Sequence, residues 1–180
     1  MNKKAINVFD YAEKIMKEVE NGVLLTGKFN DKVNTMSISW GSIGIEWNKK
    51  IFTAYVREGR YTREFLDNNP QFTVNIPMEK IDKKIISYCG LNSGRTTDKI
   101  KDLGLTLIEG EKVDVPAIKE LPLTLECKIV YKQLQDKNAI PDEIKKTTYP
   151  DDVESDNPLS NKDYHIAYYG EIVNAYIIEK

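Results

Sequence analysis

The stretch Asn34-Thr35-Met36-Ser37-Ile38-Ser39-Trp40 alternates between two kinds of side chain, which predicts a β-strand with two unlike faces. Its odd-numbered residues all carry hydroxyls, and its even-numbered residues carry an amide, a thioether, an alkyl group and an indole. Hydroxyls and backbone amides can meet the heteroatoms of a flat ligand, while sulfur and indole can meet its rings. An ordinary amphipathic strand with a solvated hydroxyl face gives the same alternation. The choice between the two interpretations depends on the neighbouring segments.

Those segments have the composition of a mainly β protein with flanking helices. The stretch forms the second arm of a predicted hairpin, in which strands at 23–29 and 33–40 enclose a turn at 30–32. Residues 41–50 are expected to be a flexible connection. Further strands are expected at 51–56, 72–76, 105–108, 123–132 and 164–178, and helices within 1–22, 62–68 and 81–89. Six or seven mainly antiparallel strands favour a small closed or partly closed β-barrel.

Length and composition limit the classes of protein that are possible. The 180 residues suit a single domain over 1–180, and a net charge of -2 provides no basic surface for nucleic acid. No run approaches the roughly 18 apolar residues of a membrane span, so a cytoplasmic protein without membrane contact is expected. Cys89 and Cys127 form no CxxC pair and are expected to be reduced thiols that pack in the interior.

A candidate anion site follows the strand at 51–56. Arg57 and Arg60 precede a short helix that Thr62 can cap, so two cations, a hydroxyl and the amides of a helix start should lie together. Such a cluster suits a phosphate group. Two arginines before a helix can equally be solvated surface charges.

Two other regions carry candidate groups. The loop at 91–99 contains Ser93, Arg95 and Lys99. Two interpretations stay open: the loop faces a ligand, or it only connects two helices. His165 is the only histidine. A lone histidine on a strand argues against a metal site and is more often structural. The polar segment 136–163 has no clear periodicity and is expected to be a lid or a partner-contacting excursion.

Several segments, taken in order, resemble those of the flavin reductase-like, FMN-binding split-barrel family, and most closely its flavoredoxin type. The resemblance runs from about Val23 to the end of the chain. It is carried by Asn34–Trp40, Arg57 with Tyr61-Thr62-Arg63, Ser93–Lys99, Leu125-Glu126-Cys127, and Tyr164-His165 with Gly170-Glu171-Ile172. The long acidic part of 136–163 departs from the family.

The resemblance implies an antiparallel Greek-key split β-barrel that forms a homodimer with FMN at or near the subunit interface. It implies that residues 34–40 line the isoalloxazine and ribityl groups. Arg57, Tyr61 and Thr62 would bind the phosphate. Ser93, Arg95 and Lys99 would reach the flavin or a nicotinamide, and His165 matches a family histidine near the active site.

The implied function is an FMN-dependent oxidoreductase, in which NAD(P)H reduces the flavin and a flavin, a metal complex or a protein accepts the electrons. Because the flavin supplies the redox chemistry, no catalytic triad or metal cluster is required of the protein. One alternative is a flavoredoxin-type electron carrier that a partner protein reduces. Another is a non-catalytic module that binds FMN or a different ligand.

Overall fold

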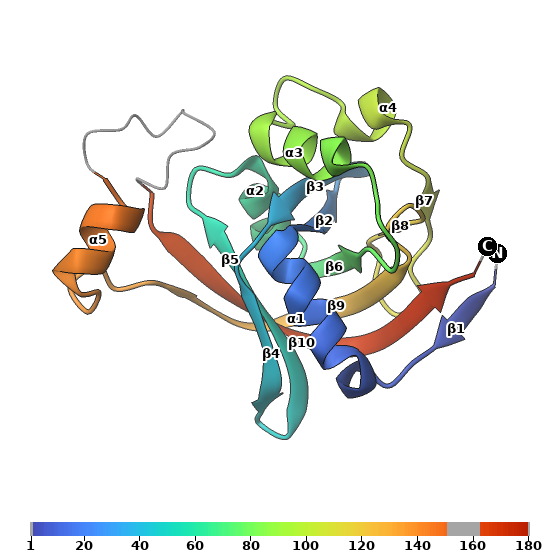
Figure 1. Ribbon diagram of the computed structural model, residues 1–180, viewed down its shortest axis with the longest axis horizontal. Coiled ribbons are helices and arrows are strands. Elements are labelled where there is room, and N and C mark those ends of the chain that lie inside the picture. Colours follow the sequence, from blue (N-terminus) through green and yellow to red (C-terminus); the bar gives the residue numbers. More distant parts are fainter. Residues whose placement is uncertain (1, 151–162, 180) are drawn as a thin grey trace.

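The computed structural model describes residues 2–150 and 163–179, in which ten strands and five α-helices follow the order shown in Figure 1. The strands are β1 Lys3–Ala5, β2 Val23–Phe29, β3 Lys32–Ile38, β4 Gly41–Glu46, β5 Lys49–Arg57, β6 Gln71–Ile76, β7 Leu107–Ile108, β8 Ala117–Ile118, β9 Leu123–Leu134 and β10 His165–Ile178. The helices are α1 Ala12–Asn21, α2 Tyr61–Asn68, α3 Lys83–Leu91, α4 Lys99–Leu103 and α5 Asp142–Thr148. A 3-10 helix, Val8–Tyr11, precedes α1.

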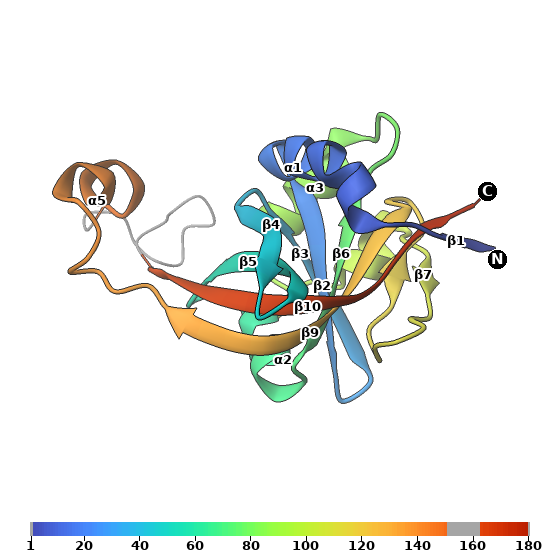
Figure 2. The ribbon, with the colours of Figure 1, turned by 90° about the horizontal axis from the view of Figure 1, so that it is seen from below.

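Eight of these strands form one antiparallel sheet. The order is β3-β2-β6-β9-β10-β5-β4, with β1 also paired to β10, while β7 and β8 make a separate ribbon. The sheet curls around a core without joining its two end strands, so the barrel is open (Figures 1 and 2). The prediction of a mainly antiparallel split barrel with flanking helices is confirmed, with more strands than the sequence pattern indicated.

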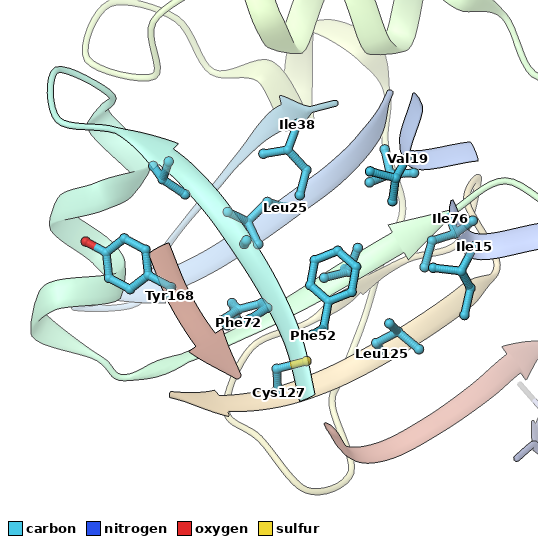
Figure 3. Packing of buried hydrophobic residues seen from close by; sticks show 14 of the residues in the cluster. Ile15, Val19, Leu25, Ile38, Phe52, Phe72, Ile76, Leu125, Cys127 and Tyr168 are labelled. Atoms are coloured by element: carbon cyan, nitrogen blue, oxygen red, sulfur yellow. The ribbon is translucent and has the colours of Figure 1, made fainter. Parts of the chain in front are cut away.

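The core lies inside this curled sheet (Figure 3). Phe52, Phe72 and Tyr168 are fully buried there, together with Cys127, whose predicted place in the core is confirmed. Burying an aromatic or aliphatic side chain of this size contributes about 1.5 to 3 kcal/mol. Burial also raises the pKa of the Cys127 thiol well above its ordinary value, so the thiol stays protonated. A Cβ at Gly170 would lie 2.5 Å from the Phe72 ring, which explains the glycine in β10.

The prediction of a flexible connection at 41–50 was wrong. This stretch forms β4, a turn at Trp47 and Asn48 with φ of 50° and 56°, and the start of β5. Its glycines suggested flexibility, but a Cβ at Gly41 would lie 2.9 Å from the Phe52 ring. Gly41 therefore allows close packing against β5.

The expected strand at 33–40 ends earlier, because β3 stops at Ile38 and leaves Ser39 and Trp40 exposed.

The polar segment 136–163 contains a helix that its composition did not reveal. Helix α5 lies beyond the ends of β9 and β10, away from the barrel (Figures 1 and 2). Residues 151–162 of the segment, with its acidic run Asp151, Asp152, Glu154 and Asp156, are outside the described residues. The longest described helix, α1, has 10 residues, and none of the described helices is long and apolar enough to cross a membrane.

Candidate functional site

A cavity of about 230 Å³ opens where four segments of the chain meet. These segments are β3, the turn from β5 into α2, the loop after α3, and the first residue of α4. The lining residues are Asn34, Met36, Arg57, Gly59, Arg60, Tyr61, Thr62, Leu91, Asn92, Ser93, Gly94 and Lys99. Seven of the residues that the resemblance assigned to a site are among them: Asn34, Met36, Arg57, Tyr61, Thr62, Ser93 and Lys99. The fold thus gathers residues that lie up to 65 positions apart in the sequence.

A buried hydrogen bond joins β3 to α2 at this cavity. Asn34 Nδ2 donates to Thr62 Oγ1 over 2.8 Å, and both residues are buried. The Thr62 oxygen accepts this bond, so its own hydroxyl proton can be donated to a ligand. A Cβ at Gly94 would lie 2.1 Å from Asn34 Oδ1. The absence of a side chain therefore lets the 93–99 loop close over Asn34.

The expectation that Thr62 caps the helix was wrong. Helix α2 begins at Tyr61, and Arg60 is its N-cap without a side-chain hydrogen bond. Thr62 lies inside the first turn, and its hydroxyl contacts Asn34 instead. Since the first amides of a helix have no acceptor within it, the start of α2 remains a partly positive group of donors beside the cavity.

Three cationic side chains, Arg57, Arg60 and Lys99, line the same cavity. Lys99 Nζ donates to the backbone oxygens of Thr35 and Cys89, over 2.8 and 3.0 Å. Arg60 Nη1 donates to the backbone oxygen of Gly90 over 2.9 Å. Arg57 is 5% exposed.

Burial and mutual repulsion depress the pKa values of these cations. Burial, with Arg60 nearby, lowers the pKa of Lys99 to about 8. Burial and the charge of Arg57 lower the pKa of Arg60 to about 10. Burial also lowers the pKa of Arg57, against the opposing effect of Asp163, whose Oδ2 lies 3.9 Å from Arg57 Nε. Three cationic side chains beside one cavity favour an anionic ligand there, in addition to the Asp163 carboxylate near Arg57.

His165 lies next to the cavity and does not line it. It is opposite Arg57 in the β5–β10 register, and the Trp40 ring lies 4.5 Å from its ring. Its Nδ1 is 3.1 Å from the Tyr149 hydroxyl. Burial and the charges of Arg57 and Arg60 lower the pKa of His165 to about 4. At neutral pH the imidazole is uncharged.

The remaining predicted residues do not line this cavity. They are Thr35, Ser37, Ile38, Ser39, Trp40 and Arg95. The Thr35 hydroxyl donates to the Leu25 backbone oxygen over 3.2 Å, and Ile38 belongs to the core. A Cβ at Gly90 would lie 2.4 Å from Ser37 Oγ, so α3 covers the hydroxyl face of β3. A ligand role for these side chains stays a prediction.

Arg95 lines a second cavity of about 820 Å³, which shares Asn34, Gly94 and Lys99 with the first. The guanidinium lies 4.7 Å from the centre of the Tyr61 ring and pairs with Glu64. Because Asn34, Gly94 and Lys99 line both cavities, the two lie side by side.

Sequence reasoning had not singled out Gly59, Leu91, Asn92, Gly94 or Tyr149. Gly59 and Gly94 lie inside the 57–62 and 91–99 segments that were selected from the sequence. A glycine next to candidate binding residues indicates that the backbone there approaches another group closely. No local pattern marks Tyr149, which comes from the polar segment after α5. Across the described ranges, no three His, Cys, Asp or Glu side chains gather in a way that could hold a metal ion.

The fold and the cavity define a split β-barrel protein with a cation-lined cavity between β3, the start of α2, the loop after α3 and α4. Residues 16–180 match the model of the flavin reductase like domain, and the chain belongs to that family.

Comparison with individual proteins agrees with this. A protein of Archaeoglobus fulgidus, of uncharacterised function, is 27% identical over 130 residues, which are 72% of this chain and 69% of that protein. A flavoredoxin from Methanosarcina acetivorans is 27% identical with a TM-score of 0.62, covering 88% of this chain and 68% of that one. An FMN-binding domain of a flavin reductase-like enzyme from Shewanella baltica has the same TM-score at 16% identity, covering 98% and 77%.

Proposed function

We propose that this chain binds FMN and acts as an oxidoreductase, with the FMN phosphate in the 230 Å³ cavity. The observation that carries the proposal is the convergence of Arg57, Arg60 and Lys99 on that one cavity. Three positive charges at one cavity attract an anion. Burial lowers the pKa of all three, and a neighbouring arginine adds to this for Arg60 and Lys99. A phosphate dianion matches this charge and accepts several hydrogen bonds.

The other lining groups fit a phosphate ester as well. The Thr62 hydroxyl and the first amides of α2 add neutral donors, as at other phosphate sites on helix starts. We place the rest of the molecule toward the neighbouring 820 Å³ cavity, which adjoins the first at Asn34, Gly94 and Lys99. The similarity of the fold to an FMN-binding domain from Shewanella baltica also supports the proposal.

When bound, FMN supplies the hydride and electron transfer. The chain's own residues bind and orient the ligand. Lys99 is fixed by two backbone carbonyls and brings a positive charge to a buried position. Such a preset charge stabilises negative charge without reorganising during the reaction. His165 is neutral at pH 7 and is suited to accepting a hydrogen bond, not to giving up a proton.

The full proposal includes NAD(P)H as reductant and a flavin, a metal complex or a protein as electron acceptor. The homodimer that the family resemblance implies and the cytoplasmic location expected from the composition also stay predictions, and sedimentation analysis would test the dimer. A second candidate function is an electron carrier, which the likeness to a flavoredoxin favours. Stopped-flow mixing separates the two. Bleaching of bound FMN by NADH or NADPH supports the enzyme, and no bleaching with either supports the carrier.

The site assignment is tested by Arg57→Ala and Thr62→Val. Each removes a charged or hydroxyl donor from the cavity, and loss of the Arg57 contact should weaken FMN binding by about 1.5 to 3 kcal/mol, or about 10- to 150-fold. Titration of FMN fluorescence measures this. Lys49→Ala is the control, because Lys49 pairs with Glu171 and lines neither cavity.

Unchanged affinity in both site variants would remove the assignment. A wild-type protein that neither carries nor takes up FMN would refute the function and leave a module for another anionic ligand.

A further inference from the structure

A hydrogen-bonded series of side chains connects the polar segment after β9 to His165. The Tyr149 hydroxyl donates to Gln135 Oε1 over 3.0 Å and lies 3.1 Å from His165 Nδ1. Gln135 follows β9 directly, Tyr149 follows α5, and His165 is the first residue of β10. The three residues therefore join three segments at the end of the barrel from which α5 projects (Figure 1).

Proton accounting decides the form of the imidazole. A tyrosine hydroxyl has one proton to donate, and here the amide oxygen of Gln135 accepts it. The contact with His165 can then be a hydrogen bond only if Nδ1 carries the proton and the Tyr149 oxygen accepts it. In a neutral imidazole this leaves Nε2 without a proton and able to accept.

The surroundings hold the ring in place and keep it neutral. Trp40 lies 4.5 Å from the imidazole at 35°, and Tyr149 meets it edge-on at 5.8 Å. Arg57 on β5 and Arg60 before α2 both oppose a positive imidazole. The Asp163 carboxylate is also close, 3.9 Å from Arg57 Nε. The Tyr149 ring stacks on Tyr164 at 4.6 Å, so its hydroxyl position is also fixed.

We propose that Tyr149 and Gln135 are positioning residues that hold His165 as the neutral Nδ1–H tautomer. Nε2 is then the ring nitrogen left to accept a hydrogen bond. Because His165 pairs across the sheet with the cavity residue Arg57, we place an N–H or O–H group of the proposed FMN opposite Nε2. The tautomer stands on the geometry alone, whereas the ligand contact rests on the proposed function. The arrangement selects for a ligand with a donor at that place and disfavours one that presents only acceptors.

Nuclear magnetic resonance of the imidazole nitrogens tests the tautomer directly, because His165 is the only histidine in the chain. In FMN-free, 15N-labelled protein at pH 7, Nδ1 should resonate as a protonated nitrogen and Nε2 as an unprotonated one. Gln135→Leu should exchange the two assignments, because Tyr149 then donates to Nδ1. Tyr149→Phe should give a mixture of tautomers. Tyr131→Phe is the matched control and should leave both nitrogen signals unchanged. The Tyr131 hydroxyl donates to Gln133 Oε1 with a length of 3.1 Å and makes no contact with His165.

Two results would overturn the proposal. One is an Nε2–H tautomer in the wild-type protein, and the other is a tautomer that Gln135→Leu leaves unchanged. If Tyr149 only anchored the polar segment, Tyr149→Phe would lower the melting temperature without moving the imidazole signals.

The ligand contact is tested by adding FMN to the same sample. The Nε2 signal should shift as sites fill, while fluorescence measures occupancy separately. Binding without any Nε2 shift refutes the contact alone. Absence of binding refutes the proposed function and leaves the tautomer result intact.

Discussion

FMN affinity should fall as the pH rises from 7 to 9, because Lys99 loses its charge within that range. Burial lowers its pKa to about 8, so Lys99 is about nine-tenths protonated at pH 7 and about one-tenth at pH 9. The phosphate is a dianion throughout, since its second pKa is about 6. The Arg60 pKa of about 10 lies above the range.

The size of the effect follows from this protonation. If the phosphate binds only the charged form of Lys99, affinity at pH 9 is about tenfold lower than at pH 7, or about 1.4 kcal/mol. Near pH 8, binding should take up about half a proton. Fluorescence titration at constant ionic strength measures the affinity, and calorimetry in two buffers of different ionisation enthalpy measures the proton.

Two substitutions make the test specific. Lys99→Met should weaken FMN and remove the dependence on pH, and Lys99→Arg should keep the charge while also removing that dependence, because arginine does not titrate here. Lys17→Met is the control, since Lys17 is exposed on α1 and lines neither cavity. A flat wild-type profile would refute the reasoning, as would a slope that survives in both Lys99 variants.

Two further substitutions address the framework of the site. Asp67 accepts hydrogen bonds from the buried Tyr168 and from two cations, which lower its pKa against the effect of burial. Because it is partly exposed, Asp67→Asn should lower the free energy of unfolding by about 1 to 2 kcal/mol. This loss, measured with urea, should shrink as the pH falls through the lowered pKa, and a loss independent of pH would contradict the ionic explanation. Gly94→Ala should displace Asn34 and weaken FMN severalfold, whereas Gly44→Ala, with no atom within 4 Å of the added Cβ, should change neither affinity nor melting temperature. Equal effects of the two alanines would exclude a specific role for Gly94.

The hydroxyl alternation at residues 34–40 predicted a strand, and β3 confirms it over Lys32–Ile38. The alternation could not show what would cover each face. Helix α3 packs over Ser37 through Gly90, while Asn34 and Met36 face the cavity. The polarity of a side chain indicates what kind of group it will contact. It does not identify that group, and the group that covers Ser37 belongs to α3, which is distant in the sequence.

At the turn between β5 and α2, the local sequence again predicted some of the site residues, and the tertiary structure supplied the others. Arg57, Arg60 and Thr62 were identified from residue type and spacing, because a helix start with nearby cations is a local feature. Lys99 becomes their neighbour only because α4 is brought against β3, where its ammonium group reaches the Thr35 carbonyl. The lowered pKa of Lys99 is a consequence of that burial and has no counterpart in the local sequence.

Residue periodicity and composition thus determined the antiparallel β architecture, the core positions such as Cys127 and most of the segments that surround the cavity. These follow from interactions between residues close in the chain and from which faces must avoid water. Only the tertiary structure decided which of the candidate side chains meet, that β4 continues the sheet, and that Tyr149 reaches His165. The reason is physical: hydrogen-bond partners, desolvation and charge proximity depend on distances between segments far apart in sequence, and folding alone sets those distances.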